Sequence, residues 1–163
     1  MAEYWNAKDG FKLRAENYIK TLPEPDLFMS YNITAKDFVN AGKASSEVKK
    51  MLKKLGVDSK ILRRTAIASY EGEINVAAHS KGGVMKCNIF EDLVHVQFTD
   101  KGPGMKDIYQ AMVPGWSTAD DLTRRMGFGA GLGLPNIENN SDALRIISAE
   151  GESTTMEFLI FFN

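Results

Sequence analysis

The sequence predicts an α+β domain in which helices pack on one face of a mixed, mainly antiparallel sheet, forming a two-layer sandwich. Two long segments with helical periodicity follow one another in the first half of the chain, with no strand between them. Pairs of apolar runs joined by short turns come after these segments, and such pairs are typical of antiparallel hairpins. The 163 residues, 44% of them hydrophobic, are enough for one domain with a buried core.

The composition argues against several classes of protein. A formal net charge of −1, with Lys and Arg spread along the chain, provides no basic surface for nucleic acid. The single cysteine, Cys87, allows no disulfide within the chain. The sequence has no apolar run of membrane-spanning length and no signal-peptide pattern near Met1. We therefore expect a cytoplasmic protein that contacts neither a membrane nor nucleic acid directly.

Two prolines close together, Pro23 and Pro25, end any helix that begins before them. They divide the chain into an N-terminal appendage, residues 1–26, and the main domain, residues 27–163. The appendage is rich in aromatic residues. We expect it to dock on the domain or on a partner.

The first part of the domain is expected to contain one strand and two helices. Residues 27–33 read as the strand, and residues 34–56 as the first helix. The next helix covers residues 60–80 and takes its N-cap from Asp58 or Ser59, because a short polar side chain there can accept a backbone N–H.

The second part of the domain is expected to contain four strands and a short helix. Two strands share residues 84–100, with a turn at 91–93. Two more share residues 143–162, with a turn at 150–153. The short helix covers residues 132–140 and follows a stretch without clear secondary structure.

That irregular stretch, residues 102–127, is long for a compact domain and has glycines at both ends. Loops of this length commonly serve as lids or binding loops. We expect a lid that hinges at its two glycine-rich ends.

Glycines recur at every second position where this stretch meets the short helix. They are Gly127, Gly129, Gly131 and Gly133. Glycine lets another group approach the main chain, and the helix that follows offers unpaired N–H groups, so the run predicts an anion site, most simply for phosphate. Glycine-rich turns also serve close helix packing. The spacing matches neither a P-loop nor a dinucleotide-binding turn.

Three polar side chains share one stripe of the helix over residues 60–80. Glu71, Asn75 and His79 are spaced by four residues. An Asn oxygen can complete the shell of a Mg²⁺ ion that phosphates and waters already hold, and a Glu one turn earlier can accept a proton. A solvated helix face is the alternative. Glu73 is a second carboxylate nearby, but its spacing turns it away from Glu71.

The end of a predicted strand supplies a third feature, Asp100 followed by Gly102 and Gly104. A carboxylate only accepts hydrogen bonds, so it fits the exocyclic amine of adenine and repels the carbonyl of guanine. We therefore expect ATP rather than GTP. A hydroxyl at Thr154 or Thr155 could support the same ring edge, although Asp100 could also be a simple turn residue and the threonines part of an ordinary hairpin.

Taken together, four ordered segments resemble the N, G1, G2 and G3 boxes of the GHKL ATPases. They are Glu71-x3-Asn75, Asp100-x-Gly102-x-Gly104, the run from Gly127 to Leu134, and Gly151-x-x-Thr154. The resemblance covers about residues 27–162, and within the superfamily the chain is most similar to bacterial anti-sigma factor serine/threonine kinases. It implies a Bergerat ATP-binding fold with a lid.

The resemblance also implies a role for each matched residue. Asn75 would hold Mg²⁺, Asp100 would read adenine with support from Thr154, and Glu71 would activate a hydroxyl on a partner protein. The nucleotide-binding set it implies is Asn75, Asp100, Gly102, Gly104, Gly127, Gly129, Gly131, Leu132, Gly133 and Thr154. The chain departs from the pattern at Ser153, where the last box often has glycine.

Two arginines, Arg124 and Arg125, precede the glycine run. They could stabilise charge on a transferred phosphate, or they could be a solvated loop pair. The expected function is an ATP- and Mg²⁺-dependent kinase that phosphorylates an antagonist protein, with a sigma factor as a further partner and a homodimer compatible with the resemblance. Two alternatives stay open: a binding module that captures a partner without phosphate transfer, and a slow ATPase.

Overall fold

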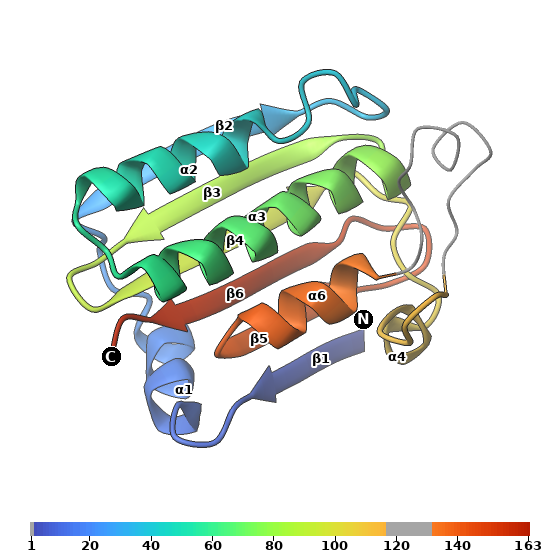
Figure 1. Cartoon of the computed structure of the whole chain (residues 1–163). Helices are drawn as coiled ribbons and strands as arrows, with labels where there is room; N and C mark the ends of the chain where they lie inside the picture. The colour runs from blue at the N-terminus through green and yellow to red at the C-terminus, as the bar shows by residue number, and fades with distance from the viewer. Residues whose placement is uncertain (1, 117–131) are drawn as a thin grey trace.

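The computed structural model describes residues 2–116 and 132–163. Its strands are β1 (Ala2–Ala7), β2 (Leu27–Ile33), β3 (Gly83–Ile89), β4 (Leu93–Asp100), β5 (Ala143–Ser148) and β6 (Thr155–Phe161). They form one six-stranded sheet in the order β1-β5-β6-β4-β3-β2 (Figure 1). Every described pairing is antiparallel, so the sheet is not mixed as expected.

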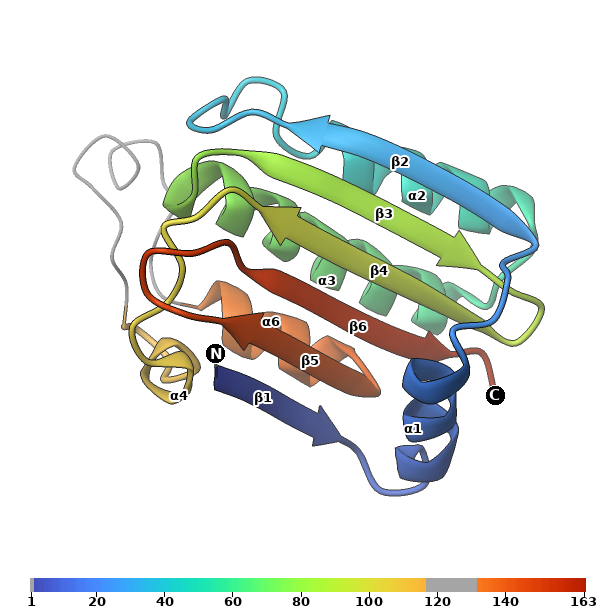
Figure 2. The same cartoon turned by 180° about the vertical axis from the view of Figure 1, so that it is seen from behind.

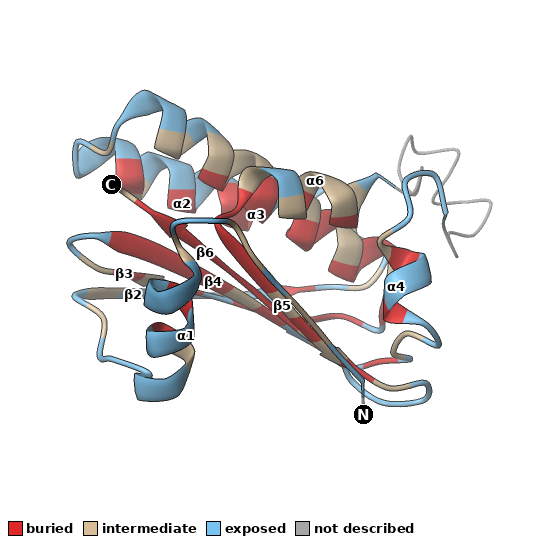
Figure 3. Ribbon diagram, turned by 90° about the horizontal axis from the view of Figure 1, so that it is seen from below, coloured by how far each residue is buried: buried red, intermediate tan, exposed pale blue. Residues whose placement is uncertain are grey.

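The helices of the described residues are α1 (Lys12–Thr21), α2 (Lys43–Lys54), α3 (Ser59–His79), α4 (Ile108–Ala111) and α6 (Gly133–Asn140). Figure 3 shows α2, α3 and α6 on one face of the sheet and α1 on the other. The α+β sandwich is therefore confirmed, with one helix added on the opposite face. None of the described helices is long and apolar enough to cross a bilayer.

The second predicted helix is confirmed as α3. The Asp58 side chain accepts a hydrogen bond from the Lys60 N–H at 2.9 Å, which caps the first turn. Both predicted hairpins also form, as β3–β4 and β5–β6. These elements are local in the sequence, which is why pattern and turn chemistry predict them well.

The first predicted helix is wrong at its start, because α2 begins at Lys43 and not near Thr34. Lys36 has φ of 61° and Gly42 has φ of 102°, and neither value is compatible with a right-handed helix. The Lys36 N–H instead donates to the Ala77 carbonyl at 2.8 Å, near the end of α3. The segment before α2 therefore closes against α3.

The main core lies between the sheet and the three helices that cover it. Phe98 and Phe158 are among its largest buried side chains. Gly72 on α3 makes room for the Phe98 ring, since a Cβ there would lie 2.3 Å from a ring carbon. The glycine in the middle of α3 thus serves close helix-to-sheet packing.

A smaller core lies on the other face of the sheet. α1 lies on this face (Figure 2), and its Ala15 and Tyr18 are buried with Leu159 and Phe161 of β6. β1 is hydrogen-bonded to β5, with Ala2 opposite Ser148. The aromatic N-terminal segment therefore contributes an edge strand and a helix to the fold.

Candidate functional site

Several predicted site residues come from segments that meet at one end of the sheet. The C-terminal half of α3, the end of β4, the start of β6 and the start of α6 all lie toward the same end of the molecule (Figure 1). The structure places Glu71 and Asn75 on α3, and Asp100 at the end of β4. The predicted residues outside the described part of the chain are Arg124, Arg125, Gly127, Gly129 and Gly131.

Asp100 is the centre of a fixed turn. Its Oδ1 accepts the Gly102 N–H at 2.8 Å and the Thr154 N–H at 2.9 Å. Its own N–H donates to the Thr154 carbonyl at 2.9 Å. The structure therefore brings together Asp100, Gly102 and Thr154, which lie up to 54 residues apart in the sequence.

Gly102 and Gly104 are the right residue type for this turn. Their φ angles are 97° and 80°, in the left-handed region that favours glycine. A Cβ on Gly104 would lie 1.9 Å from the Ala149 carbonyl oxygen. Only a residue without a side chain fits at Gly104, between the segment that follows β4 and the segment that follows β5.

Ser148 belongs to the same turn but was not predicted. Its Oγ is 2.6 Å from Thr154 Oγ1 and accepts the Met105 N–H at 2.8 Å. Ser148 ends β5, directly before the β5–β6 turn. A hydroxyl at the end of an apolar strand was the signal available in the sequence.

Glu71 lies against the start of α6. It is half-buried and hydrogen-bonded to the Asn136 side chain. A Cβ on Gly133 would lie 3.3 Å from its Oε2. Burial raises the pKa of the Glu71 carboxyl, and the hydrogen bond to Asn136 opposes part of that rise. A carboxylate with a raised pKa, beside the first turn of α6, suits a proton acceptor.

Asn75 lies one turn after Glu71 and is partly exposed. Among residues 2–116 and 132–163, no three His, Cys, Asp or Glu side chains are grouped to hold a metal. A metal at Asn75 would therefore take most of its ligands from phosphates and water, which suits Mg²⁺. The residues present are compatible with that ion.

Glu73 points to a different helix. It is 3% exposed, and its carboxylate accepts the N–H groups of Ala44 at 3.3 Å and Ser45 at 3.0 Å. These are two of the unpaired N–H groups at the start of α2. Glu73 is a structural cap on α2.

The alternation of apolar and polar residues over 94–99 predicts that His95 is a surface strand residue, and that prediction is wrong. It is 5% exposed, with its Nε2 3.0 Å from Glu157 Oε1 and its Nδ1 3.0 Å from Asn88 Nδ2. The Tyr18 ring of α1 lies over it, with centroids 4.8 Å apart. The strand alternation was right, but α1 covers the outer face.

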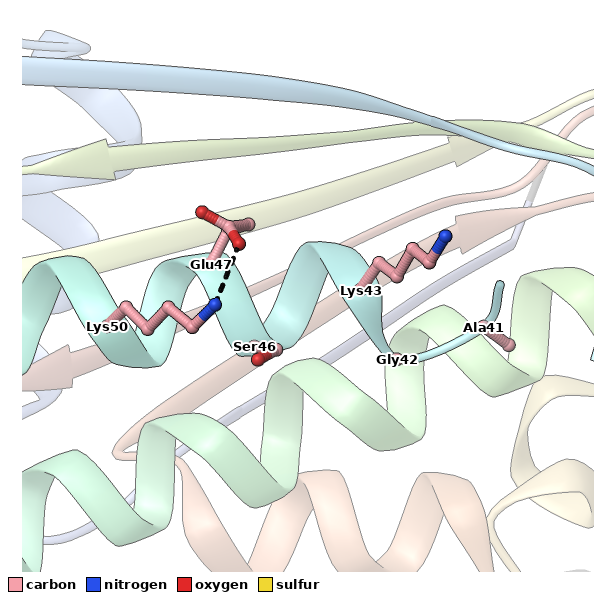
Figure 4. A pocket seen from close by; sticks show the side chains of 6 residues that line it. All are labelled: Ala41, Gly42, Lys43, Ser46, Glu47 and Lys50. Atoms are coloured by element: carbon pink, nitrogen blue, oxygen red, sulfur yellow. Dashed lines mark hydrogen bonds and ion pairs between the residues drawn. The ribbon is translucent and has the colours of Figure 1, made fainter. Parts of the chain in front are cut away.

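A hollow of about 590 Å³ opens beside the first turns of α2. Its lining residues are Ala41, Gly42, Lys43, Ser46, Glu47 and Lys50 (Figure 4). Lys50 and Glu47 form an exposed ion pair there, at 3.3 Å. None of the predicted site residues lines this hollow, so it is separate from the candidate site.

Comparison with known proteins gives two kinds of similarity. No family model matches the chain. The anti-sigma F factor of Clostridium novyi (strain NT) is 33% identical over 97 residues, which are 56% of this chain and 63% of that protein. The anti-sigma F factor of Clostridium beijerinckii is 34% identical over 79 residues, 48% of this chain and 52% of that protein. The chain therefore spans about half to three-fifths of the relatives it matches.

Two solved structures share the fold. One holds the RsbU and RsbW domains of Rv1364c from Mycobacterium tuberculosis, with a TM-score of 0.51 and 18% identity, over 81% of this chain and 31% of that one. The other is the SiaB-SiaC complex from Pseudomonas aeruginosa, with a TM-score of 0.55 and 14% identity, over 92% of this chain and 98% of the matched chain.

The likeness to these two solved structures is one of fold. The sequence matches support the resemblance to anti-sigma factors, because the chain is similar to anti-sigma F factors over about half of its length.

Proposed function

We propose that this chain is an ATP- and Mg²⁺-dependent serine/threonine protein kinase of the anti-sigma type. Its acceptor would be a Ser or Thr on an antagonist protein in a cytoplasmic partner-switching pathway, with a sigma factor as a further partner. The observation that carries the proposal is the turn around Asp100, which is held by backbone N–H groups of Gly102 and Thr154. This arrangement leaves Oδ2 of Asp100 as an acceptor for the adenine amine.

In the proposed reaction, Glu71 takes the proton of the acceptor hydroxyl while the oxygen of that hydroxyl forms a bond to the γ-phosphorus of ATP. The bond from that phosphorus to the bridging oxygen breaks, and ADP leaves. Bound Mg²⁺, held through Asn75, would neutralise charge on the phosphates. N–H groups from Gly127 to Gly133, Leu132 included, would cradle the phosphates. Arg124 and Arg125 are proposed to stabilise the transferred charge.

The first test is calorimetric titration of ATP, with and without Mg²⁺, into the wild type and Asp100→Asn. The amide oxygen of Asn can still accept the Gly102 and Thr154 N–H groups, so the turn should survive. We expect ATP binding that GTP does not reproduce, and a loss of at least about tenfold in Asp100→Asn from one lost hydrogen bond to the base. Equal binding of ATP and GTP would contradict the adenine site.

The second test is phosphate transfer from labelled ATP to a candidate antagonist protein. Glu71→Gln should keep ATP binding and lower transfer by at least about a hundredfold, because the amide cannot accept the proton. Glu47→Gln, on the exposed face of α2, is the matched control. The name anti-sigma F factor among the relatives favours a second candidate, a module that captures a sigma factor without transfer. Nucleotide-dependent capture with no transfer would support it instead.

A further inference from the structure

Tyr4 on the edge strand β1 contacts both helices that flank residues 117–131. Its hydroxyl donates to Glu138 Oε2 on α6. Its ring meets the Tyr109 ring of α4 edge-on, with centroids 5.4 Å apart and planes at 69°. One side chain of the N-terminal segment thus joins the sheet edge to α4 and α6.

α6 is a helix of eight residues, too short to be stable by itself, so its position depends on what it touches. On one side, the Lys8 ammonium donates to the Asn139 carbonyl at 2.9 Å. On the other, Arg64 of α3 donates to the Asn140 carbonyl at 3.1 Å. Both bonds hold the last turn of α6, where cations complement the helix dipole.

The Tyr4 bond differs from these because it holds a side chain of that last turn, Glu138, and not a backbone carbonyl. Burial and the neighbouring Glu138 raise the pKa of the Tyr4 phenol, so its hydroxyl stays protonated and donates. Glu138 is itself only partly exposed. Without the phenol, its carboxylate would lose a donor in a partly dehydrated place.

The first turn of α6 carries Gly133, which faces the Glu71 carboxylate. A rotation or shift of α6 about its last turn would move this first turn the most. The Tyr4 bond holds the Glu138 side chain, which lies away from the helix axis, and so restrains rotation of α6.

We propose that Tyr4 is a positioning residue for the nucleotide, acting through Glu138 to fix the first turn of α6 where phosphates would bind. The inference rests on the proposed function, in which that turn faces ATP. Tyr4 need not touch the nucleotide.

The test uses Tyr4→Phe, which keeps the ring and removes only the hydroxyl. Tyr109→Phe is the matched control, because the Tyr109 side chain is 66% exposed and its ring contact with Tyr4 is kept. Glu138→Gln is the conservative variant, since its amide oxygen can still accept the phenol. The readouts are the Kd for ATP and amide hydrogen exchange of α6 without nucleotide.

We expect Tyr4→Phe to weaken ATP binding roughly three- to tenfold, the effect of one charge-assisted hydrogen bond, and to speed exchange in α6. Tyr109→Phe should stay near wild type, and Glu138→Gln should fall between wild type and Tyr4→Phe, because it keeps an acceptor for the phenol but loses the charge. Unchanged Kd and exchange in Tyr4→Phe would overturn the inference and leave the proposed function intact. Faster exchange in β4 as well as α6 would also overturn it, because Tyr4 would then only stabilise the whole fold.

A wild type that binds no ATP is a separate outcome, because it would overturn the proposed function and the nucleotide-positioning role together.

Discussion

The Glu71 carboxylate of α3 and the Asn136 amide of α6 are hydrogen-bonded across the two helices. This bond lowers the pKa of Glu71 against the rise that burial causes. Asn136→Leu has nearly the same shape but cannot donate, so it should raise the pKa of Glu71 further. A base acts when deprotonated, so the acid limb of the rate profile for phosphate transfer should move to higher pH. Asn139→Leu, on the exposed side of α6, should leave the limb in place.

That experiment has a clear contrary result. A profile that keeps its acid limb while kcat falls at every pH would mean that Asn136 acts on something other than the protonation of Glu71. A direct titration of the Glu71 carboxyl by NMR would separate the two cases without any acceptor protein.

Gly72→Ala tests the contact between α3 and β4. On an exposed helix face this change would stabilise by about 1 kcal/mol, because Ala favours helix more than Gly. Here the new Cβ would lie 2.3 Å from the Phe98 ring, so we expect destabilisation by about 1 to 3 kcal/mol from overpacking. Urea unfolding measures whether the free energy of unfolding rises or falls. The double variant Gly72→Ala with Phe98→Leu should recover part of the lost stability. If Gly72→Ala alone is more stable than the wild type, the Phe98 ring can move aside at little cost.

Glu73→Ala tests the cap that α3 provides for α2. The change removes the acceptor of the Ala44 and Ser45 N–H groups at a buried helix start, so it should cost about 1 to 3 kcal/mol. Glu47→Ala, four residues into the exposed face of α2, should change stability by no more than about 0.5 kcal/mol. Thermal and urea unfolding of both variants give the comparison. Equal losses of stability in the two variants would mean that the loss comes from removing a negative charge near the start of α2, and not from removing the cap.

Cys87 on β3 should be unreactive in the folded protein. It is fully buried, and burial raises the pKa of its thiol to about 12. The thiolate is the form that attacks thiol reagents, so at pH 8 the folded chain should react only through opening of the sheet. The same reagent in urea should modify Cys87 rapidly and in full. Stoichiometric modification of the folded protein within the mixing time would show that β3 opens easily.

Local chemistry predicted much of this fold. The cap at Asp58 and the turn between β3 and β4 act within a few residues, and both formed where expected. The start of α2 was missed because Lys36 adopts a positive φ, which nothing in its residue type suggests.

The residues of the candidate site also fall into those that a local motif predicts and those that depend on distant contacts. Asp100 and its glycines were predicted from a short motif, and their turn is present. Asn136, Ser148 and Tyr4 were not predicted, because each acquires its partner only when distant elements pack together. His95 was misjudged for the same reason, since the helix that covers it lies far earlier in the chain.

The pairing of β1 with β5 also sets an order of assembly. Ala2 lies opposite Ser148, so during synthesis β1 has no partner until β5 has been made. The hairpins can close early because their loops are short, whereas this pairing closes the longest loop in the sheet. We expect the N-terminal strand to join last in refolding, and the Tyr4 contact to α6 to form only then. The candidate site would thus reach its native geometry only in the final step of folding.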